Sequence, residues 1–467
     1  MMMLRASTRA YHNRLNTFRP RYFSASSSVA DKPFVVGIAR ETYDHSNWER
    51  RAPLTPRHVK ELLTHHPRDQ TIQVVVQPST HRIFSNCEYE AAGATIQDDL
   101  SSADLILGVK RPRSTREIYP NTTYAMFAHV HKGQAENMGL LQTLLDKKSA
   151  LLDYECITTT DIEKPQRLVA FGKFAGLAGM TDTLQTLGKH LLSDGYTTPF
   201  LNCPPTICHA TLDDAKMSVS HLGERIAADG LELSPISSPL VFAMTGKGGN
   251  VHSGVKEIFE LLPHEIVSVD ELPDVIAQNT TSVQKKVYGL HLGTCDLYRS
   301  IQEADKFDRE HFQSNPSAFK SIFASDIAPY VSVLINGAYW DARFPKLLTK
   351  ENLFDLYHTP GKDRLMLISD ISCDIQGSVE CLLHSTSIDK PSFIYDPISG
   401  QEIEHGRGIT IMGVDILPTE LPVESSEHFG DAIVKIISEM AQSRDSAGTI
   451  SIDQLSTSLV SMVLEIL

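Results

Sequence analysis

The chain has 467 residues, of which 41% are hydrophobic, and it carries a formal net charge of −14. No apolar run reaches the roughly 18 residues of a membrane span, and the acidic balance disfavours nucleic acid and anionic membranes as partners. The seven cysteines include no CxxC pair, which disfavours a zinc finger and favours a reduced compartment. A chain of this length has room for more than one domain core.

Residues 1–30 differ in composition from the rest of the chain. They are rich in arginine and serine, and the first acidic residue is Asp31. This pattern is typical of a mitochondrial transit peptide, with a disordered basic tail as the alternative. We exclude the segment from the fold and expect the mature chain to work in the mitochondrial matrix.

From Pro33 onward, apolar runs typical of strands alternate with stretches typical of helices. The strand-like runs are FVVGIAR, IQVVVQP, ADLILGVK, YAMFAHV and ALLDYE. Helical patterns such as PRHVKELLTHH lie between several of them, which predicts an α/β fold with a parallel sheet covered on both faces. A long helical stretch follows at residues 171–192, and its small residues would allow close backbone packing.

A second α/β unit begins with the strand pattern PLVFAMT. The glycine-rich turn GKGGNVHSG, an amphipathic helix and a strand ending at Asp270 follow. This order is typical of a dinucleotide site, because glycines let the backbone approach a pyrophosphate and a helix N-terminus favours an anion. The alternative is a plain glycine-rich turn. The candidate cofactor residues are Gly246, Gly248, Gly249, Asn250, Gly254 and Asp270.

Charged residues follow several strands of the first unit. They are Arg40, Lys110, His129, and Asp153 or Glu155. Each alone is most simply a solvated loop residue, but ligands of open parallel sheets bind beyond the carboxyl ends of the strands. With Arg51 and Lys132 nearby, this edge is locally basic within an acidic chain. We therefore expect a small polycarboxylate ligand there.

His129 and His131, in the segment AHVHKGQ, would share one face of an extended strand. A zinc site is the alternative, but no third ligand of matching spacing is visible and structural zinc takes four, so we predict no metal. A histidine near a lysine at the mouth of a nucleotide cleft suits proton transfer, because its unperturbed pKa is about 6.5.

The chain from Pro33 to Gly430 resembles the lysine-ketoglutarate reductase part of the mitochondrial α-aminoadipic semialdehyde synthases. The resemblance lies in ERRAPLTP, ILGVKRP, FAHVHKGQ, LLDYE, VAFGKFAGLAGM, KVYG, LINGAYW, ISDISCD and LPTELPVESSEHFGD. A more distant resemblance is to fungal lysine-forming saccharopine dehydrogenase and to alanine dehydrogenase. It implies two Rossmann-like domains with parallel sheets and an active site in the cleft between them. We assign 33–170 plus 378–467 to the substrate domain and 171–377 to the dinucleotide-binding domain.

The resemblance also implies the reaction and the roles of the site residues. L-lysine and 2-oxoglutarate would condense to an imine, which NADPH reduces to saccharopine. Lys110 and His129 correspond to the acid/base pair, Arg51 to a carboxylate-binding arginine, and Asp374 to a residue facing the nicotinamide. The other implied substrate-site residues are Arg40, Lys132, Gln134 and Glu155.

Three features depart from the family pattern. The chain stops near residue 467, so we expect a monofunctional enzyme without the saccharopine-oxidising domain. The glycine turn is one residue longer than the GTGNV-type turn of the animal reductases, which leaves open which glycine contacts the pyrophosphate. Asp270 stands where an acidic residue bonds a ribose 2′-OH, which favours NADH; following the family, we predict NADPH.

Two other interpretations remain. One is an NAD-dependent saccharopine dehydrogenase working in the lysine-forming direction. The other is a catalytically silent nucleotide-binding regulator, which the presence of Lys110 and His129 disfavours. The sequence leaves open whether the chain forms a homo-oligomer.

Overall fold

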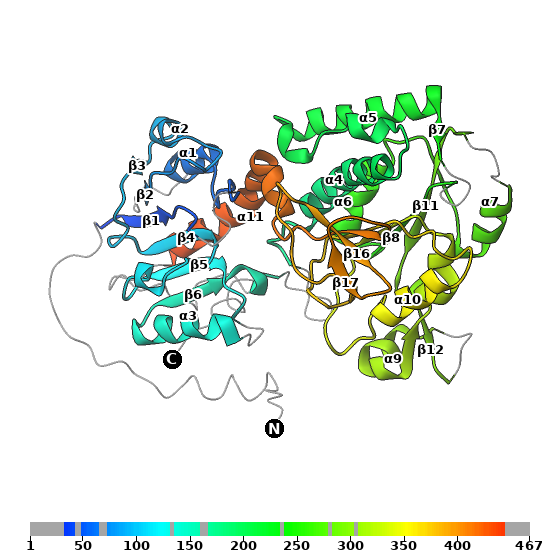
Figure 1. Ribbon diagram of the computed structural model, residues 1–467. Coiled ribbons are helices and arrows are strands. Elements are labelled where there is room, and N and C mark those ends of the chain that lie inside the picture. The colour runs from blue at the N-terminus through cyan, green and yellow to red at the C-terminus, as the bar shows by residue number, and fades with distance from the viewer. Residues whose placement is uncertain are drawn as a thin grey trace.

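The computed structural model describes residues 32–42, 48–64, 72–130, 135–158, 167–233, 238–278, 283–302 and 307–443. They form two α/β units that lie side by side (Figure 1). The predicted transit peptide at 1–30 lies outside the described residues, and so do the predicted site residues Lys132 and Gln134.

The first unit is a six-stranded parallel sheet with the order β3-β2-β1-β4-β5-β6. Its strands are β1 (Phe34–Ile38), β2 (Ile72–Val76), β3 (Thr95–Ile96), β4 (Leu105–Lys110), β5 (Thr123–Phe127) and β6 (Ala150–Asp153). Its helices include α1 (Pro56–Thr64), α2 (Asn86–Ala91) and α3 (Ala135–Asp146). Val36 and Ile38 of β1 enter one apolar core and Val35 enters another. Both faces of this strand are therefore covered, as its continuous apolar run predicted.

The helix α4 (Gly172–Ser193) leads from the first unit into the second. It packs against α6 (Asn250–Phe259) with almost no space between the two backbones. A Cβ atom at Gly176 would overlap the carbonyl oxygen of Val251, and one at Gly254 would overlap that of Lys173. The close packing predicted for this helix is confirmed.

The second unit contains an eight-stranded sheet with the order β17-β16-β18-β15-β14-β8-β11-β9. Its strands are β8 (Val241–Thr245), β9 (His264–Ile266), β11 (Val287–Leu292), β14 (Val333–Asn336), β15 (Leu367–Asp370), β16 (Ser392–Asp396), β17 (Gln401–Ile403) and β18 (Ile409–Met412). β16 runs antiparallel to both its neighbours. The prediction of a parallel sheet is therefore wrong at this edge, because the connection between β16 and β17 is too short for a parallel crossover.

The second unit also contains further helices and strands. They are α5 (Leu212–Asp229), β7 (Leu231–Glu232), α7 (Leu272–Gln278), β10 (Val283–Gln284), α8 (Thr294–Leu297), β12 (Tyr298–Ser300), α9 (Arg309–Ser314), β13 (Phe319–Ser321) and α10 (Lys350–His358). None of the helices in the described part of the chain combines the length and apolar content needed to cross a membrane.

The chain returns to the first unit later than predicted. We assigned 378–467 to the substrate domain, but β16, β17 and β18 extend the second sheet, where β18 pairs with β15. The helix α11 (Pro422–Gln442) is the part that packs on the first unit, and Figure 1 shows it beside β4. There Phe429 stacks on Phe171, and the Ser426 hydroxyl accepts the N–H of Ala52. The described return segment is thus α11.

Candidate active site

His129 lies just beyond the carboxyl end of β5. Its φ of 56° is a left-handed conformation, which is uncommon outside glycine and concentrates at functional sites. Its Nδ1 lies 2.8 Å from Oε2 of Glu155, and Oε1 of that carboxylate lies 3.1 Å from Nη1 of Arg167. Since a carboxylate only accepts hydrogen bonds, Nδ1 carries the proton and Nε2 is the basic nitrogen. The arrangement can exchange a proton with a ligand at Nε2.

Glu155 reaches His129 from the turn η4 (Tyr154–Cys156), which follows β6. The Asp153 side chain fixes this turn by accepting the N–H of Glu155 at 3.1 Å. The Glu155 side chain is only 4% exposed, whereas that of His129 is 33% exposed. A buried carboxylate thus orients an imidazole that stays accessible. Sequence reasoning placed Glu155 at the substrate, and the structure gives it His129 as a partner.

Lys110 ends β4, on the strand next to β5. Lys110 pairs with Phe127, and His129 follows Phe127 by two residues. The neighbouring strands therefore deliver Lys110 and His129 to the same edge of the sheet, where the sequence predicted them. Their roles as an acid/base pair remain a prediction.

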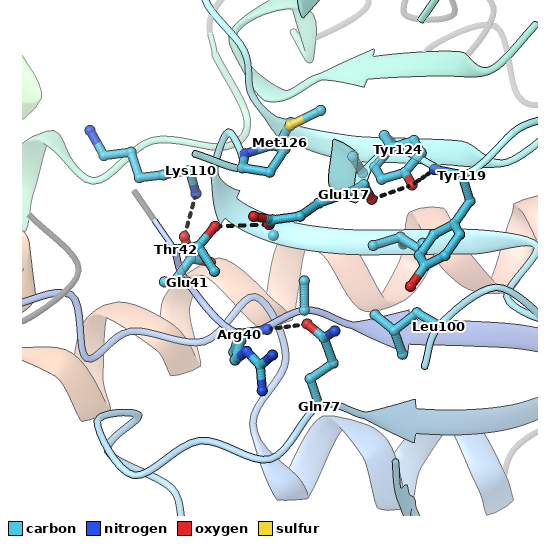
Figure 2. Close-up of a pocket in the computed structure, with 15 residues that line it drawn as sticks. Arg40, Glu41, Thr42, Gln77, Leu100, Lys110, Glu117, Tyr119, Tyr124 and Met126 are labelled. Atoms are coloured by element: carbon cyan, nitrogen blue, oxygen red, sulfur yellow. Dashed lines mark hydrogen bonds between the residues drawn. The ribbon is translucent and has the colours of Figure 1, made fainter. Parts of the chain in front are cut away.

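A hollow of about 190 Å³ lies beside Lys110 in the first unit (Figure 2). Arg40 and Lys110 are the predicted site residues that line it. The Arg40 guanidinium extends toward Asp98, with Nη1 2.7 Å from Oδ1. Among the described site residues, His129 and Arg51 lie outside this particular hollow.

Arg51 has an internal partner that sequence reasoning did not foresee. Its Nε and Nη2 donate to the two carboxylate oxygens of Glu49 at 2.7 and 2.5 Å, and its guanidinium lies over the Phe171 ring. Burial acts to raise the pKa of Glu49, but Arg51 and the charge of Lys110 bring it below its usual value. In this structure Arg51 is 4% exposed and bound to Glu49.

The turn between β8 and α6 has the backbone geometry that a pyrophosphate requires. Gly246 and Gly248 have φ values of 79° and 88°, where glycine is favoured. Gly249 is the N-cap of α6, and no side chain caps this helix. The first N–H groups of the helix, beginning at Asn250, can therefore bind an anion. These residues fit a dinucleotide.

Gly254 lies farther along α6 and has a different role. Its missing side chain makes room for the backbone of α4 at Lys173 and Leu177. The position thus faces the neighbouring helix, and the contact of Gly254 with the cofactor stays a prediction.

A hollow of about 750 Å³ opens beside the glycine turn, and Asp270 lines it. Asp270 follows β9, which pairs with β11 and is separated from β8 by that strand. Asp270 thus stands one strand farther from the glycine turn than the ribose-binding position of a standard dinucleotide fold. Three cationic side chains also line the hollow: Lys247, Lys256 and Arg299.

Asp374 follows β15 in the second unit. A buried polar network lies at the end of this strand. The Thr245 hydroxyl donates to Oδ1 of Asn336 at 2.8 Å, and Nδ2 of Asn336 donates to Oδ1 of Asp370 at 3.0 Å. Burial raises the pKa of Asp370 to about 6. The network joins the carboxyl ends of β8, β14 and β15. Asp374 therefore belongs to the same sheet edge as the glycine turn.

The two units approach each other near Arg167 and Tyr339. Tyr339 follows β14; burial and Asp341 raise the pKa of its hydroxyl, while the charges of Arg343 and Arg167 oppose that rise. Arg167 is also the partner of Glu155 in the first unit. The segment that supports His129 thus lies close to a loop of the second unit.

His131 lies outside the described residues, so the zinc alternative at AHVHKGQ stays an alternative. Among the described residues, one group with metal-ligand spacing is His58, Glu427 and Asp431. Arg57 donates to both carboxylates at 2.6 Å. A guanidinium therefore already balances the charge of this group.

Sequence reasoning missed Glu41, Glu49 and Arg167. Glu41 follows Arg40 at the end of β1, so the strand-end argument applied to Arg40 could have found it. Glu49 stands two residues before Arg51 in ERRAPLTP. Arg167 has no such signal, because an isolated bridge to Thr158 brings it to Glu155.

The chain is similar in sequence to one known domain family and to several known proteins. Residues 37–178 match the N-terminal domain family of alanine dehydrogenase and PNT. The chain is 42% identical over 419 residues to the α-aminoadipic semialdehyde synthase of Arabidopsis thaliana, covering 87% of the chain and 38% of that protein. The mitochondrial α-aminoadipic semialdehyde synthase of Bos taurus is 38% identical over 425 residues, covering 87% of the chain and 43% of that protein. The chain thus spans less than half the length of these two relatives.

Two further proteins are more distantly similar. The NAD(+), L-lysine-forming saccharopine dehydrogenase of Neurospora crassa is 26% identical over 413 residues, covering 85% of the chain and 88% of that protein. A solved L-alanine dehydrogenase structure superposes with a TM-score of 0.54 at 14% identity, covering 92% of the chain and 94% of that structure. This structural likeness supports the fold of two Rossmann-like units.

Proposed function

We propose that the protein is a lysine-ketoglutarate reductase. The premise is its sequence similarity: residues 37–178 match the alanine dehydrogenase/PNT N-terminal domain family, and most of the chain is homologous to the α-aminoadipic semialdehyde synthases. The ε-amine of L-lysine condenses with the keto carbon of 2-oxoglutarate, and the imine is reduced with NADPH to saccharopine. This reaction is the first step of lysine degradation by the saccharopine pathway.

The oriented imidazole of His129, beside Lys110, carries the proposal. Imine formation needs a deprotonated amine and the loss of water from a carbinolamine, and both steps move protons. Nε2 of His129 can accept and return a proton, because Glu155 holds Nδ1. Lys110, at the end of the next strand, is the second proton carrier and adds positive charge for the substrate carboxylates.

The remaining substrate contacts are assigned by motif position. Arg40, Lys132 and Gln134 are proposed to bind substrate, and Arg51 a substrate carboxylate. Arg51 already bonds Glu49 through Nε and Nη2, so a substrate carboxylate would be bound by the remaining N–H groups of its guanidinium.

The nicotinamide nucleotide is proposed to bind at the glycine turn of the second unit. The N–H groups at the start of α6 would hold the pyrophosphate, and Asp374 would lie beside the nicotinamide, which supplies the hydride when bound. NADPH is favoured over NADH because Lys247, Lys256 and Arg299 line the hollow that also contains Asp270. The three cations outnumber the two carboxylates of this hollow, Asp270 and Asp296, so a 2′-phosphate should be attracted more than it is repelled.

Changing single charges in this hollow should change the cofactor preference. We expect Asp270→Ala to raise the ratio of kcat/KM for NADPH to that for NADH, and Lys256→Ala to lower it, each by roughly two- to fivefold, as expected for a partly exposed charge pair. Steady-state kinetics with both nucleotides measures the ratio. Lys286→Ala is the control, because Lys286 pairs with Glu265 and does not line the hollow. An unchanged ratio for Asp270→Ala would place Asp270 away from the nucleotide.

The substrate assignment is tested with the chain purified from about Ala30 onward. We expect it to oxidise NADPH only when L-lysine and 2-oxoglutarate are both present, because the reducible imine forms only from the two together. Absorbance at the reduced-nicotinamide band measures the reaction. Activity with pyruvate and ammonia instead would assign the protein to alanine dehydrogenase chemistry.

The second candidate function is the NAD-dependent, lysine-forming direction of the same chemistry. The similarity to the Neurospora crassa enzyme and the presence of Asp270 in the hollow favour it. A strong preference for NADH in the same assay would select it. A mitochondrial location, in the matrix, is proposed from the composition of residues 1–30 and from the mitochondrial name of the Bos taurus relative.

A further inference from the structure

The strand β4 is irregular at the point where it ends in Lys110. Leu107 pairs with Ala125 of β5 and Lys110 pairs with Phe127, so β4 fits one extra residue into this step. Such a bulge bends the strand and re-aims the side chains near it, and bulges are frequent next to active sites. The extra residue therefore changes the direction in which Lys110 leaves the sheet.

Glu41 bonds the irregular part of β4. The N–H of Val109 donates to Oε1 of Glu41 at 2.7 Å. The N–H of Lys110 donates to Oε2 at 3.0 Å, a bond drawn in Figure 2. Successive N–H groups of a regular strand point to opposite neighbours, so one carboxylate can accept both only where the strand bulges. The backbone ladder between β1 and β4 ends at Ile38 and Leu107. Glu41, three residues beyond Ile38, continues it with its side chain.

The carboxylate of Glu41 is held in surroundings that disfavour its charge. Burial and the nearby Glu49 raise its pKa to about 7, while the two N–H bonds and Arg51 oppose this rise. Asparagine, serine or threonine could not accept two diverging N–H groups with two equivalent oxygens. Burying a carboxylate costs folding free energy. The position accepts this cost because two N–H groups need two acceptor oxygens.

We propose that Glu41 is a positioning residue for Lys110: it holds the bulge that aims the Lys110 side chain. In Figure 2 this side chain extends away from the end of the hollow that contains Tyr119 and Leu100. The role of Lys110 itself rests on the proposed reductase function. The two hydrogen bonds from the N–H groups of Val109 and Lys110 to Glu41, called the clamp below, can be tested even if the protein is not a reductase.

The kinetic test compares Glu41→Gln with Glu117→Gln. Glu117 lines the same hollow, but it accepts the Thr42 hydroxyl and does not bond β4. We expect Glu41→Gln to lower kcat by about 10- to 100-fold with an unchanged KM for NADPH, because small misplacements of a reacting group cost this much. Glu117→Gln should leave kcat within about twofold of the unchanged protein, since no bond to the strand is lost.

A double-mutant cycle separates positioning from a general loss of structure. If Glu41 acts through Lys110, then Glu41→Gln should cause little further loss of kcat in a protein that already carries Lys110→Met. An equal loss in both backgrounds, or no loss in either, overturns the inference.

Amide hydrogen exchange of the full chain tests the clamp without any substrate. In Glu41→Gln we expect at least one of the amides of Val109 and Lys110 to exchange about tenfold faster, because glutamine keeps a single acceptor oxygen and its NH2 group faces the other amide. Both amides should exchange unchanged in Glu117→Gln. Equal exchange in Glu41→Gln and the unchanged protein overturns the inference whether or not the protein is a reductase. A protected pair of amides in a protein without reductase activity would instead contradict the proposed function and support the clamp.

Discussion

Lys110→Met and His129→Ala should each lower kcat by about 10²–10⁴-fold and leave the affinity for NADPH nearly unchanged, since general acid/base catalysis contributes about this much. Neither residue lies in the glycine turn, and both stand at the carboxyl edge of the first sheet. Steady-state kinetics with L-lysine, 2-oxoglutarate and NADPH measures kcat, and fluorescence titration measures nucleotide binding. The double variant should lose much less than the product of the two single losses, because residues that act as one unit are not additive.

A matched control separates the chemistry of His129 from the loss of any histidine–glutamate contact. His384 lies 2.8 Å from the Glu402 carboxylate, as His129 does from Glu155, but at an exposed edge of the second sheet. His384→Ala should leave kcat within about twofold, as expected for a surface change away from the site. A loss confined to KM for 2-oxoglutarate would make His129 a carboxylate binder. Equal losses at His129 and His131, restored by added zinc, would support the metal alternative.

Strands such as β1, β4 and β8 could be predicted because their signal is local. FVVGI and LILGV are apolar without a break, as is typical of strands covered on both faces. The glycine turn was found for the same reason, since Gly246 and Gly248 adopt backbone conformations that favour glycine. The segment 171–192 was identified as a close-packing helix from its small residues alone.

Pairing between distant segments could not be predicted in the same way. The run EIVSVD is the next strand after β8 in the sequence, but β11 lies beside β8 and β9 lies outside β11. The strands of residues 392–412 were assigned to the first unit, although their ladder partners lie in the second. Strand order depends on which apolar faces meet in three dimensions, and each of these runs is apolar enough to fit several positions.

The site shows the same division. The strand-end rule placed Lys110, His129 and Glu155 at one edge, because the carboxyl ends of parallel strands meet there. It could not show that Glu155 bonds His129, or that Glu41 bonds the backbone beneath Lys110, because one extra residue in β4 decides the second contact. Residue types and strand order predict which groups gather, and bulges and turns decide which of them touch.

Gly254→Ala and Gly176→Ala should strongly destabilise the fold. At each position the added Cβ would overlap a backbone carbonyl oxygen of the facing helix, Lys173 in one case and Val251 in the other. A backbone atom cannot rotate away as a side chain can, so α4 and α6 must separate. We expect the free energy of unfolding to fall by about 3 kcal/mol or more, at the upper end for overpacked sites. Thermal unfolding of the purified variants measures it, as a midpoint lowered by roughly 6–12 °C.

Gly139→Ala is the matched control, because Gly139 also lies within a helix, α3, but a Cβ atom there would meet nothing within 4 Å. The same substitution should then be neutral or stabilising by up to about 1 kcal/mol, since alanine favours a helix more than glycine does. The α6 helix begins directly after the glycine turn, so forcing it away from α4 should also displace the N–H groups that face the pyrophosphate. Variants at Gly254 that fold should therefore lose affinity for NADPH and NADH equally. If Gly254→Ala proves as stable as Gly139→Ala, the close contact between α4 and α6 is not what selects glycine there. If Gly254→Ala loses affinity for one nucleotide alone, Gly254 contacts the cofactor.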